Sequence, residues 1–147
     1  MPVHEAWLEE LPPDECDVLL RAGSVGRVAF VVGDFPVIVP VNYQVVSTTQ
    51  GERLALRTRE GGLIDEAPIS VAFEIDGIDP LRRQGWSVLV RGALRHASPE
   101  EVLQPPGLEP WVDGRREVIV LIEPYKVTGR RLHAASSGWP FHLRAYL

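Results

Sequence analysis

The 147-residue sequence holds a single cysteine, Cys16, and no obvious targeting segment. One thiol cannot form an internal disulfide, and no spacing of cysteine and histidine matches a structural zinc site. The N-terminus has no basic stretch followed by an apolar segment, so we predict no secretory signal. No run of about 18 apolar residues occurs, so no segment is expected to cross a membrane. These absences together predict a cytoplasmic protein.

The signatures of several common enzyme mechanisms are also missing. The chain has no Walker-type phosphate loop and no GxGxxG sequence. None of its four histidines accompanies a nucleophile-elbow sequence. Glu74, Asp76 and Asp79 lack the spacing and the glycine of an EF-hand loop, so we expect no metal site there. The sequence therefore identifies no catalytic side chain.

The charge balance argues against nucleic acid as a partner. The chain has 15 Lys and Arg residues against 20 Asp and Glu residues, for a net charge of −5, whereas nucleic-acid-binding domains are usually basic. Six of the acidic residues lie within residues 1–17, which contain no Lys or Arg. Lys126, Arg130 and Arg131 form a basic cluster near the other end. An anionic ligand would need such groups.

Length and composition predict one domain spanning residues 1–147, because 45% hydrophobic residues are enough for one core. Strands are predicted over residues 27–32, 37–43, 53–58, 69–75, 86–96, 117–123 and 126–132. Apolar residues alternate strictly over residues 53–58 and 69–75, whereas they dominate both faces over residues 27–32. Short strands without long helices between them favour a mainly β fold, a β-barrel of six or seven strands. Pro40 should lie at an edge, bulge or kink, and Gly92 should mark a bend.

Two short helices complete the prediction. The first follows an N-terminal arm of residues 1–13 and covers about residues 14–22, with Asp14 as its cap. Its apolar face includes Cys16, which we expect to pack in the core. The second begins at Ser98, which forms a capping-box pattern with the glutamates that follow. Residues 133–147 are left as a C-terminal tail that contains both flexible and aromatic residues.

One candidate ligand segment combines a strand end with two glycines. Arg57 and Thr58 end a strand and lead into Gly61 and Gly62. Glycines let backbone amides approach an anion, while the guanidinium and the hydroxyl add donors. The segment suits a phosphate group. The alternative interpretation is an ordinary Gly-Gly turn after an exposed strand end.

Three further segments carry groups suited to a flat ligand. Pro40 interrupts an apolar strand just before Asn42, so that unpaired backbone groups there can face a planar ring. Trp86 and Ser87 begin a later strand, where an indole can cover a ring and a hydroxyl can donate. Arg130 lies on a late strand. Each segment also has a purely structural interpretation: an edge strand, core packing and a charged strand end.

Taken in this order, these segments resemble the pyridoxamine 5′-phosphate oxidase-related proteins, which are flavin-binding split β-barrels, and in particular their small single-domain branch. The matching segments lie within residues 14–132 and cover residues 25–30, 36–43, 57–62, 71–76, 85–92 and 127–131. The resemblance implies a Greek-key split barrel and a homodimer. The flavin would lie in a groove between the two barrels, so both chains would line it.

The resemblance also implies a role for each candidate segment. The flavin ring would meet the backbone at Val39, Pro40, Val41 and Asn42, and the phosphate would meet Arg57, Thr58, Gly61 and Gly62. Trp86 and Ser87 match a strand that often reaches the cofactor from the other subunit, and Arg130 matches a position near the groove. Leu63 stands where many relatives carry a lysine that pairs with the phosphate, and such a charge-assisted bond is worth about 1.5–3 kcal/mol.

The function that the resemblance implies is that of an FMN-binding oxidoreductase, in which the flavin carries the chemistry of an unidentified small-molecule substrate. A deazaflavin-dependent reductase on the same fold and a non-catalytic flavin carrier or sensor are the alternatives. The longer C-terminal substrate-binding segment of the vitamin-forming oxidases is absent, so pyridoxamine phosphate oxidation is not expected.

Overall fold

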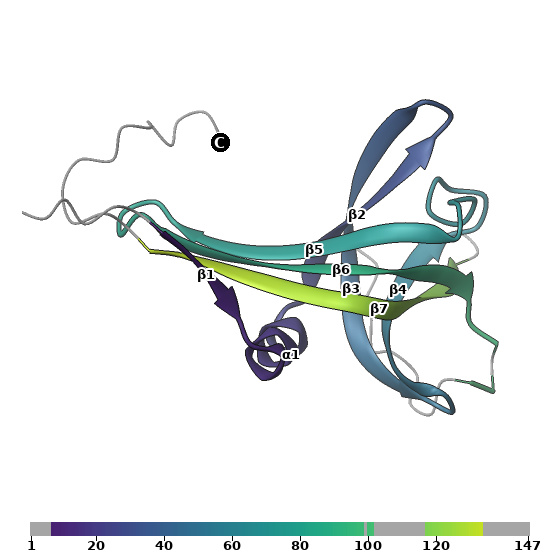
Figure 1. Ribbon diagram of the computed structural model, residues 1–147. Coiled ribbons are helices and arrows are strands. Elements are labelled where there is room, and N and C mark those ends of the chain that lie inside the picture. Colours follow the sequence, from purple (N-terminus) through teal and green to yellow (C-terminus); the bar gives the residue numbers. More distant parts are fainter. Residues whose placement is uncertain (1–6, 99, 102–116, 134–147) are drawn as a thin grey trace, which may run out of the picture.

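The computed structural model describes residues 7–98, 100–101 and 117–133, and most of these belong to one antiparallel sheet (Figure 1). The sheet runs in the spatial order β1-β7-β4-β3-β2-β5-β6, and a further pairing of β6 with β7 closes it into a barrel. β5 returns to lie beside β2, which gives the Greek-key order. The predicted mainly β split barrel is therefore confirmed. The strands are β1 (Trp7–Leu11), β2 (Val25–Val32), β3 (Phe35–Thr48), β4 (Gly51–Arg59), β5 (Ser70–Asp79), β6 (Gln84–His96) and β7 (Glu117–His133).

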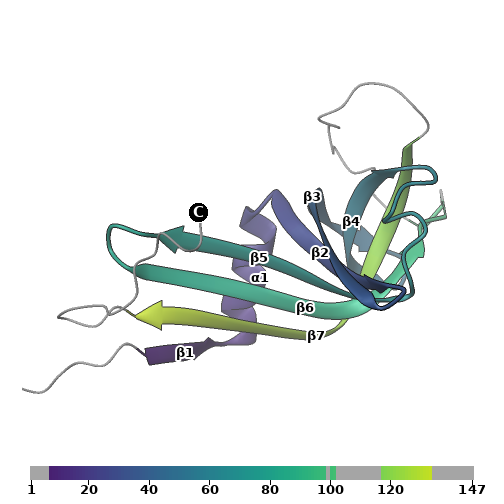
Figure 2. The same cartoon turned by 90° about the horizontal axis from the view of Figure 1, so that it is seen from above.

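Strand β3 changes partner along its length. Its first half, as far as Asn42, pairs with β2, and its second half, from Tyr43 onward, pairs with β4. Figure 2 shows the consequence: β5, β6 and β7 run as a long ribbon away from the end where β3 and β4 lie. The split of the barrel therefore falls between Asn42 and Tyr43, where β3 stops pairing with β2 and begins to pair with β4.

The helix α1 (Pro13–Ala22) begins one residue earlier than predicted. Its N-cap residue is Pro12, which makes no side-chain cap hydrogen bond, so the predicted capping role of Asp14 is wrong. Asp14 lies instead in the first turn, where a negative charge favours the helix dipole. Proline is tolerated at the first helical position because its missing N–H has no partner there. The N–H of Gly23 donates to the carbonyl oxygen of Leu19 at 3.2 Å and ends the helix.

The second predicted helix is not among the described elements. The N–H of Glu101 donates to the carbonyl oxygen of Ser98 at 3.1 Å. Residues 102–116, where the helix would continue, lie outside the described part of the chain, as do residues 134–147 of the predicted tail. Among the described residues there is no helix with the length and hydropathy needed to traverse a bilayer.

Two predicted strands are one in the structure. The prediction of separate strands over residues 117–123 and 126–132 is wrong, because β7 continues through a bulge at Pro124 and Tyr125. The bulge lies opposite Gly92, where the register of the β6–β7 pair shifts, so the predicted bend there is confirmed. A Cβ atom on Gly92 would lie 2.4 Å from the carbonyl oxygen of Glu123. Only glycine fits this close approach.

The predicted N-terminal arm also contains a strand. β1 pairs with the last part of β7, from Trp7 opposite His133 to Leu11 opposite Gly129. A Cβ atom on Gly129 would lie 2.6 Å from Sγ of Cys16 and 3.0 Å from Cβ of Leu11. Strand β1 and the helix α1 therefore both pack directly against this end of β7.

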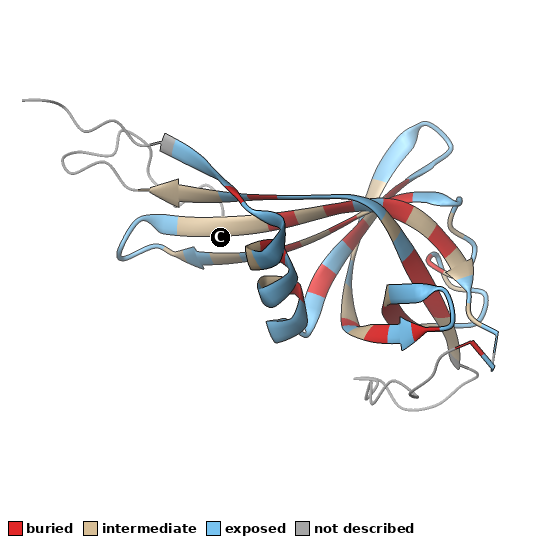
Figure 3. Cartoon of the chain, turned by 60° about the horizontal axis from the view of Figure 1, so that its bottom comes forward, coloured by how far each residue is buried: buried red, intermediate tan, exposed pale blue. Residues whose placement is uncertain are grey.

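The buried residues lie mainly on the strands, and two of them lie on α1 (Figure 3). Cys16 and Leu20 of α1 belong to this core, as the helical spacing predicted. Burial raises the pKa of the Cys16 thiol. Phe73 is fully buried, and its ring meets the ring of Tyr43 edge to face, with centroids 4.8 Å apart.

Tyr43 should make the protein lose stability at alkaline pH. Its hydroxyl donates to the carbonyl oxygen of Leu20 at 2.6 Å, and burial raises the pKa of Tyr43 to about 12, whereas an unfolded tyrosine has a pKa of about 10. The folded state therefore holds this proton more tightly. Its contribution is complete below pH 10 and is lost as the pH rises towards 12, by about 2 kcal/mol.

Urea unfolding between neutral pH and about pH 11.5 measures this effect. The Tyr43→Phe variant should be less stable at neutral pH by about 1 kcal/mol, and its stability should decline less steeply above pH 10. Parallel declines of the wild type and the variant would contradict the assignment to Tyr43.

Candidate functional site

The pairing of β3 with β4 stops part of the way along the two strands, and we call this break in the ladder the opening between β3 and β4. Their pairing ends at Tyr43 opposite Leu56. Beyond this point, among the described residues, residues 35–42 of β3 pair only with β2, and residues 57–59 of β4 pair only with β7. Each strand thus has one backbone edge without a strand partner among the described residues. Such edges present N–H and C=O groups that need a ligand or water. The edge position predicted for Pro40 is confirmed.

Asn42 and Arg57 flank this opening on the same face of the sheet. Tyr43 and Leu56, which oppose each other in the β3–β4 pair, are buried in the core. Because successive residues of a strand point to opposite faces, Asn42 and Arg57 point outward. Both are half-buried. The structure therefore brings together one residue from each of two predicted segments.

The remaining predicted residues on these two strands have different positions. Val39 and Val41 pack against the core, so their side chains hold the strand while its backbone edge stays available. Pro40 is exposed on the outer face, opposite Arg27 of β2. Thr58 lies opposite Val118, which also packs against the core. From β3, therefore, the groups that lie at the opening are backbone groups and the side chain of Asn42. Arg57 of β4 lies there too.

The glycine loop after β4 makes hydrogen bonds within itself. Gly61 has a φ of 72°, which favours glycine, and its N–H donates to Oδ2 of Asp65 at 2.7 Å. The N–H of Gly62 donates to the carbonyl oxygen of Arg59 at 3.0 Å. Ile64 is buried in the core and anchors the loop. Both glycine amides that were predicted to meet a phosphate thus have protein acceptors in this structure.

Asp65 and His96 are two residues of this site that the sequence analysis missed. The other carboxylate oxygen of Asp65 contacts Nε2 of His96, at the end of β6. The contact with His96 and the N–H of Gly61 lower the pKa of the Asp65 carboxyl, so it remains ionised at neutral pH. The sequence does contain a signal for Asp65, which lies four residues after Gly61 in a segment rich in turn residues. Aspartate in such a segment often accepts a hydrogen bond from a nearby backbone N–H.

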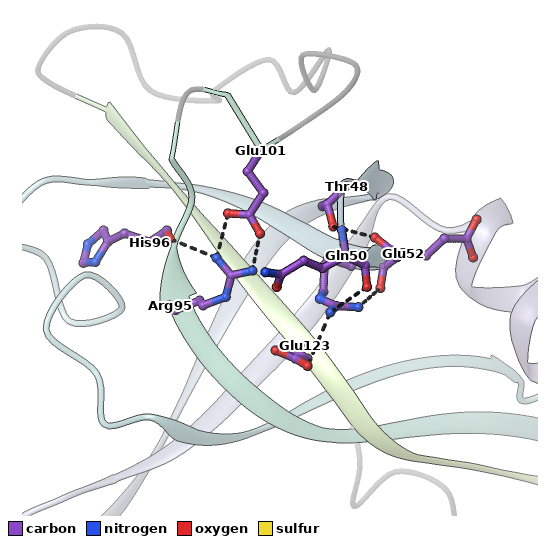
Figure 4. Close-up of polar contacts among 9 residues, drawn as sticks. Thr48, Gln50, Glu52, Arg95, His96, Glu101 and Glu123 are labelled. Carbon is purple, nitrogen blue, oxygen red and sulfur yellow. Dashed lines mark hydrogen bonds and ion pairs between the residues drawn. The ribbon is translucent and has the colours of Figure 1, made fainter.

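A polar cluster fixes the end of β6 that carries His96 (Figure 4). Arg95 donates to both carboxylate oxygens of Glu101, one of them at 2.7 Å. The carbonyl oxygen of Glu101 accepts the N–H of Thr49 at 3.2 Å. The end of β6 is therefore tied to the turn between β3 and β4, and the ring of His96 points away from Arg95 in this view.

Trp86 and Ser87 lie on opposite faces of β6. Ser87 opposes Arg130 on β7, so these two predicted residues share the outer face. Trp86 points to the other face, where a Cβ atom on Gly77 would lie 2.5 Å from its Nε1 atom. The indole therefore lies against β5 at Gly77. It borders a cavity of about 450 Å³ whose lining residues are Gly77, Ile78, Asp79, Gln84, Gly85, Trp86, Arg131, Leu132 and His133.

One chain does not bring the two arginines of the predicted site together. Arg57 opposes Ile119 near the start of β7. Arg130 lies eleven residues further along this strand, which at about 3.3 Å per residue is roughly 35 Å. Figure 1 shows β7 extending away from β4 in this way. The candidate residues thus form two groups, one at the opening and one on the β6–β7 ribbon.

Comparisons with known proteins agree with this architecture. The sequence pattern of the family described as pyridoxamine 5′-phosphate oxidase matches residues 12–131. The uncharacterized protein Rv0080 of Mycobacterium tuberculosis is 39% identical over 132 residues, which cover 86% of this chain and 87% of that protein.

Two solved structures are also similar. A FAD binding protein from Mycobacterium smegmatis shares 31% identity, with a TM-score of 0.62 and coverage of 85% of this chain and 98% of that one. A putative pyridoxamine 5′-phosphate oxidase from Corynebacterium glutamicum shares 27% identity, with a TM-score of 0.65 and coverage of 84% and 92%. The present chain belongs to the pyridoxamine 5′-phosphate oxidase family.

Proposed function

We propose that this protein binds a flavin between two copies of the chain and uses it to oxidise or reduce a small molecule. The opening between β3 and β4 carries the proposal. There the free backbone edge of residues 39–42 stands beside Arg57. A flat ring with polar edges can bond to such an edge, and a guanidinium suits the phosphate. The family membership and the flavin ligand in the name of the M. smegmatis relative support this choice.

The protein's own part in the reaction is to bind and orient the ring. The backbone N–H of Asn42 would stabilise the negative charge that a flavin gains on reduction. The N–H of Val41 instead points towards β2, as the N–H of Tyr43 does where it donates to the carbonyl oxygen of Ser24. The packed side chains of Val39 and Val41 keep this edge in place. The flavin supplies the hydride or electron transfer, so no side chain has to act as a nucleophile.

The second copy would contribute Trp86, Ser87 and Arg130. Because Arg57 and Arg130 lie far apart in one chain, a site that contains both must be assembled from two chains. The hairpin of β2 and β3 supports such an assembly, since it exposes several large apolar side chains that a partner would cover. These residues are Val31, Val32, Phe35 and Ile38.

A fluorescence-quenching titration of the purified protein with flavins tests the proposal. We expect saturable binding with a Kd below about 100 µM, which corresponds to about −5.5 kcal/mol. The bound flavin should be reduced by a nicotinamide nucleotide or a substrate. Absence of saturable binding would contradict the proposal. A bound flavin that only dithionite reduces would identify a carrier instead, and tighter binding of a deazaflavin would identify a deazaflavin-dependent protein.

A further inference from the structure

Outward-facing residues form a straight row across the neighbouring strands β3, β2, β5, β6 and β7, and this row limits how two copies of the chain can pack together. We infer that Asp76, the middle residue of the row, lies at the two-fold axis of the dimer and there faces Asp76 of a second copy. The inference rests on the proposed flavin site shared by two chains, and it can be tested without flavin.

The register of the strand pairs defines the row. Asn42 of β3 lies opposite Val25 of β2. The β2–β5 pairing, continued by two residues beyond its last pair, places Val25 beside Asp76. Asp76 lies opposite Ser87 of β6, and Ser87 lies opposite Arg130 of β7. Because neighbouring strands are about 4.8 Å apart, Asn42 and Arg130 lie roughly 10 Å from Asp76 on its two sides.

The proposed flavin site fixes the position of the axis relative to this row. A shared site needs the Asn42 end of the row in one chain to lie opposite the Arg130 end in the other. When two copies of a sheet pack face to face about a two-fold axis, two residues that face each other lie at equal distances on either side of the axis. The axis therefore passes midway between Asn42 and Arg130, over Asp76, and follows β5.

The outer face around Asp76 can accept a second sheet. Ala29 of β2 and Ala72 of β5 lie opposite each other in the β2–β5 pair, and both are half-buried between fully packed neighbours. Such small side chains let the backbone of a second copy come close. Leu89 of β6, which is also half-buried, adds apolar surface on the same face. A second copy of this chain is thus the occupant that fits this face.

An ion pair holds the carboxylate of Asp76 in place. Nη1 of Arg27 donates to Oε2 of Glu74 at 2.9 Å and to Oδ2 of Asp76 at 3.3 Å. The side chains of Glu74 and Asp76 are only 30% and 32% exposed. Desolvation and the neighbouring carboxylate of Asp76 raise the pKa of Glu74, so these two acids already oppose each other's charge. At the axis, each would also meet its own copy, and the charge of Asp76 would weaken the dimer.

Cysteine cross-linking tests the position of the axis. The natural Cys16 is only 1% exposed and should not react. A short bifunctional maleimide should join Asp76→Cys to its own copy, because sheets packed face to face are about 10 Å apart. Glu74→Cys, on the same face of β5, should cross-link as well. The control is Thr128→Cys, on the same face of β7. It should stay uncross-linked, because two strands on each side of the axis separate the copies by about 19 Å along the sheet.

The strength of the dimer tests the role of the charge. Asparagine at position 76 keeps an acceptor for Arg27 and removes the charge, so Asp76→Asn should tighten the dimer about three- to tenfold. Sedimentation of the flavin-free protein over a range of concentrations measures this affinity. Asp14→Asn, which removes an exposed carboxylate on α1, should leave it unchanged.

The outcomes separate this inference from the proposed function. A dimer that cross-links through Thr128→Cys but through neither cysteine on β5 would overturn the position of the axis. Unchanged or weaker association of Asp76→Asn would overturn the role of its charge. Cross-linking through Asp76→Cys in a protein that binds no flavin would support the axis and contradict only the proposed function. A chain that stays monomeric at all concentrations would overturn both.

Discussion

Replacing Arg57 by alanine should weaken flavin binding by about ten- to a hundredfold and leave the melting temperature of the flavin-free protein nearly unchanged. A hydrogen bond from a guanidinium to a phosphate contributes about 1.5–3 kcal/mol, and each 1.4 kcal/mol is about a factor of ten in affinity. Arg57 is half-buried at the opening of the barrel and not in its core. Flavin titration and thermal melting of the same sample measure both quantities.

The matched control is Arg82→Ala in the turn between β5 and β6. The side chain of Arg82 is 79% exposed and lies outside both groups of candidate residues, so neither quantity should change. An Arg57→Ala protein that no longer folds without flavin would show that Arg57 is structural. An unchanged flavin affinity would show that the phosphate is bound elsewhere.

Replacing Phe73 by alanine should lower the free energy of unfolding by about 3–5 kcal/mol, because it removes a large side chain from a packed core. Phe73 is fully buried against the ring of Tyr43. It also lies so close to β2 that a Cβ atom on Gly26 would be 2.3 Å from its Cζ atom. The surrounding strands are paired on both sides and cannot easily close the cavity. Urea unfolding measures the loss.

Two further variants keep this prediction testable. Leu81→Ala is a matched control, because this leucine is 94% exposed, and it should change stability by less than about 0.5 kcal/mol. Phe73→Leu should cost less than Phe73→Ala and gives a folded protein to measure if the alanine variant does not fold. A loss of under about 1 kcal/mol for Phe73→Ala would contradict the packing described here.

The strands could be predicted from the sequence where one face is buried. The alternation of residues 53–58 and 69–75 follows directly from a strand with a core side and an outer side. The prediction was wrong for β7. A proline such as Pro124 usually indicates the end of a strand, whereas here a bulge opposite Gly92 lets the strand continue. It also failed in β1, whose five residues include two adjacent glutamates and show no clear alternation.

The candidate site was less predictable because its geometry depends on contacts between distant segments. Asn42 and Arg57 flank the opening because β3 changes partner after Asn42, and no local pattern encodes that change. Asp65 and His96 are 31 residues apart in the sequence. By contrast, the opposite orientation of Trp86 and Ser87 follows from the two-residue period of a strand and could have been deduced.

We propose that each flavin site combines the opening of one chain with the β6–β7 ribbon of another. A mixed dimer of the Arg57→Ala and Arg130→Ala variants tests it most directly. Each variant alone should bind flavin weakly at both sites. In the mixed dimer, one site has lost both arginines, and the other has kept Arg57 from one chain and Arg130 from the other.

The measurement is the flavin stoichiometry and affinity of this mixed dimer, purified through two different tags. We expect one flavin bound per mixed dimer, with an affinity close to that of the wild type. A mixed dimer that binds flavin no more tightly than either variant alone, or a wild-type protein that binds flavin as a monomer, would contradict a shared site.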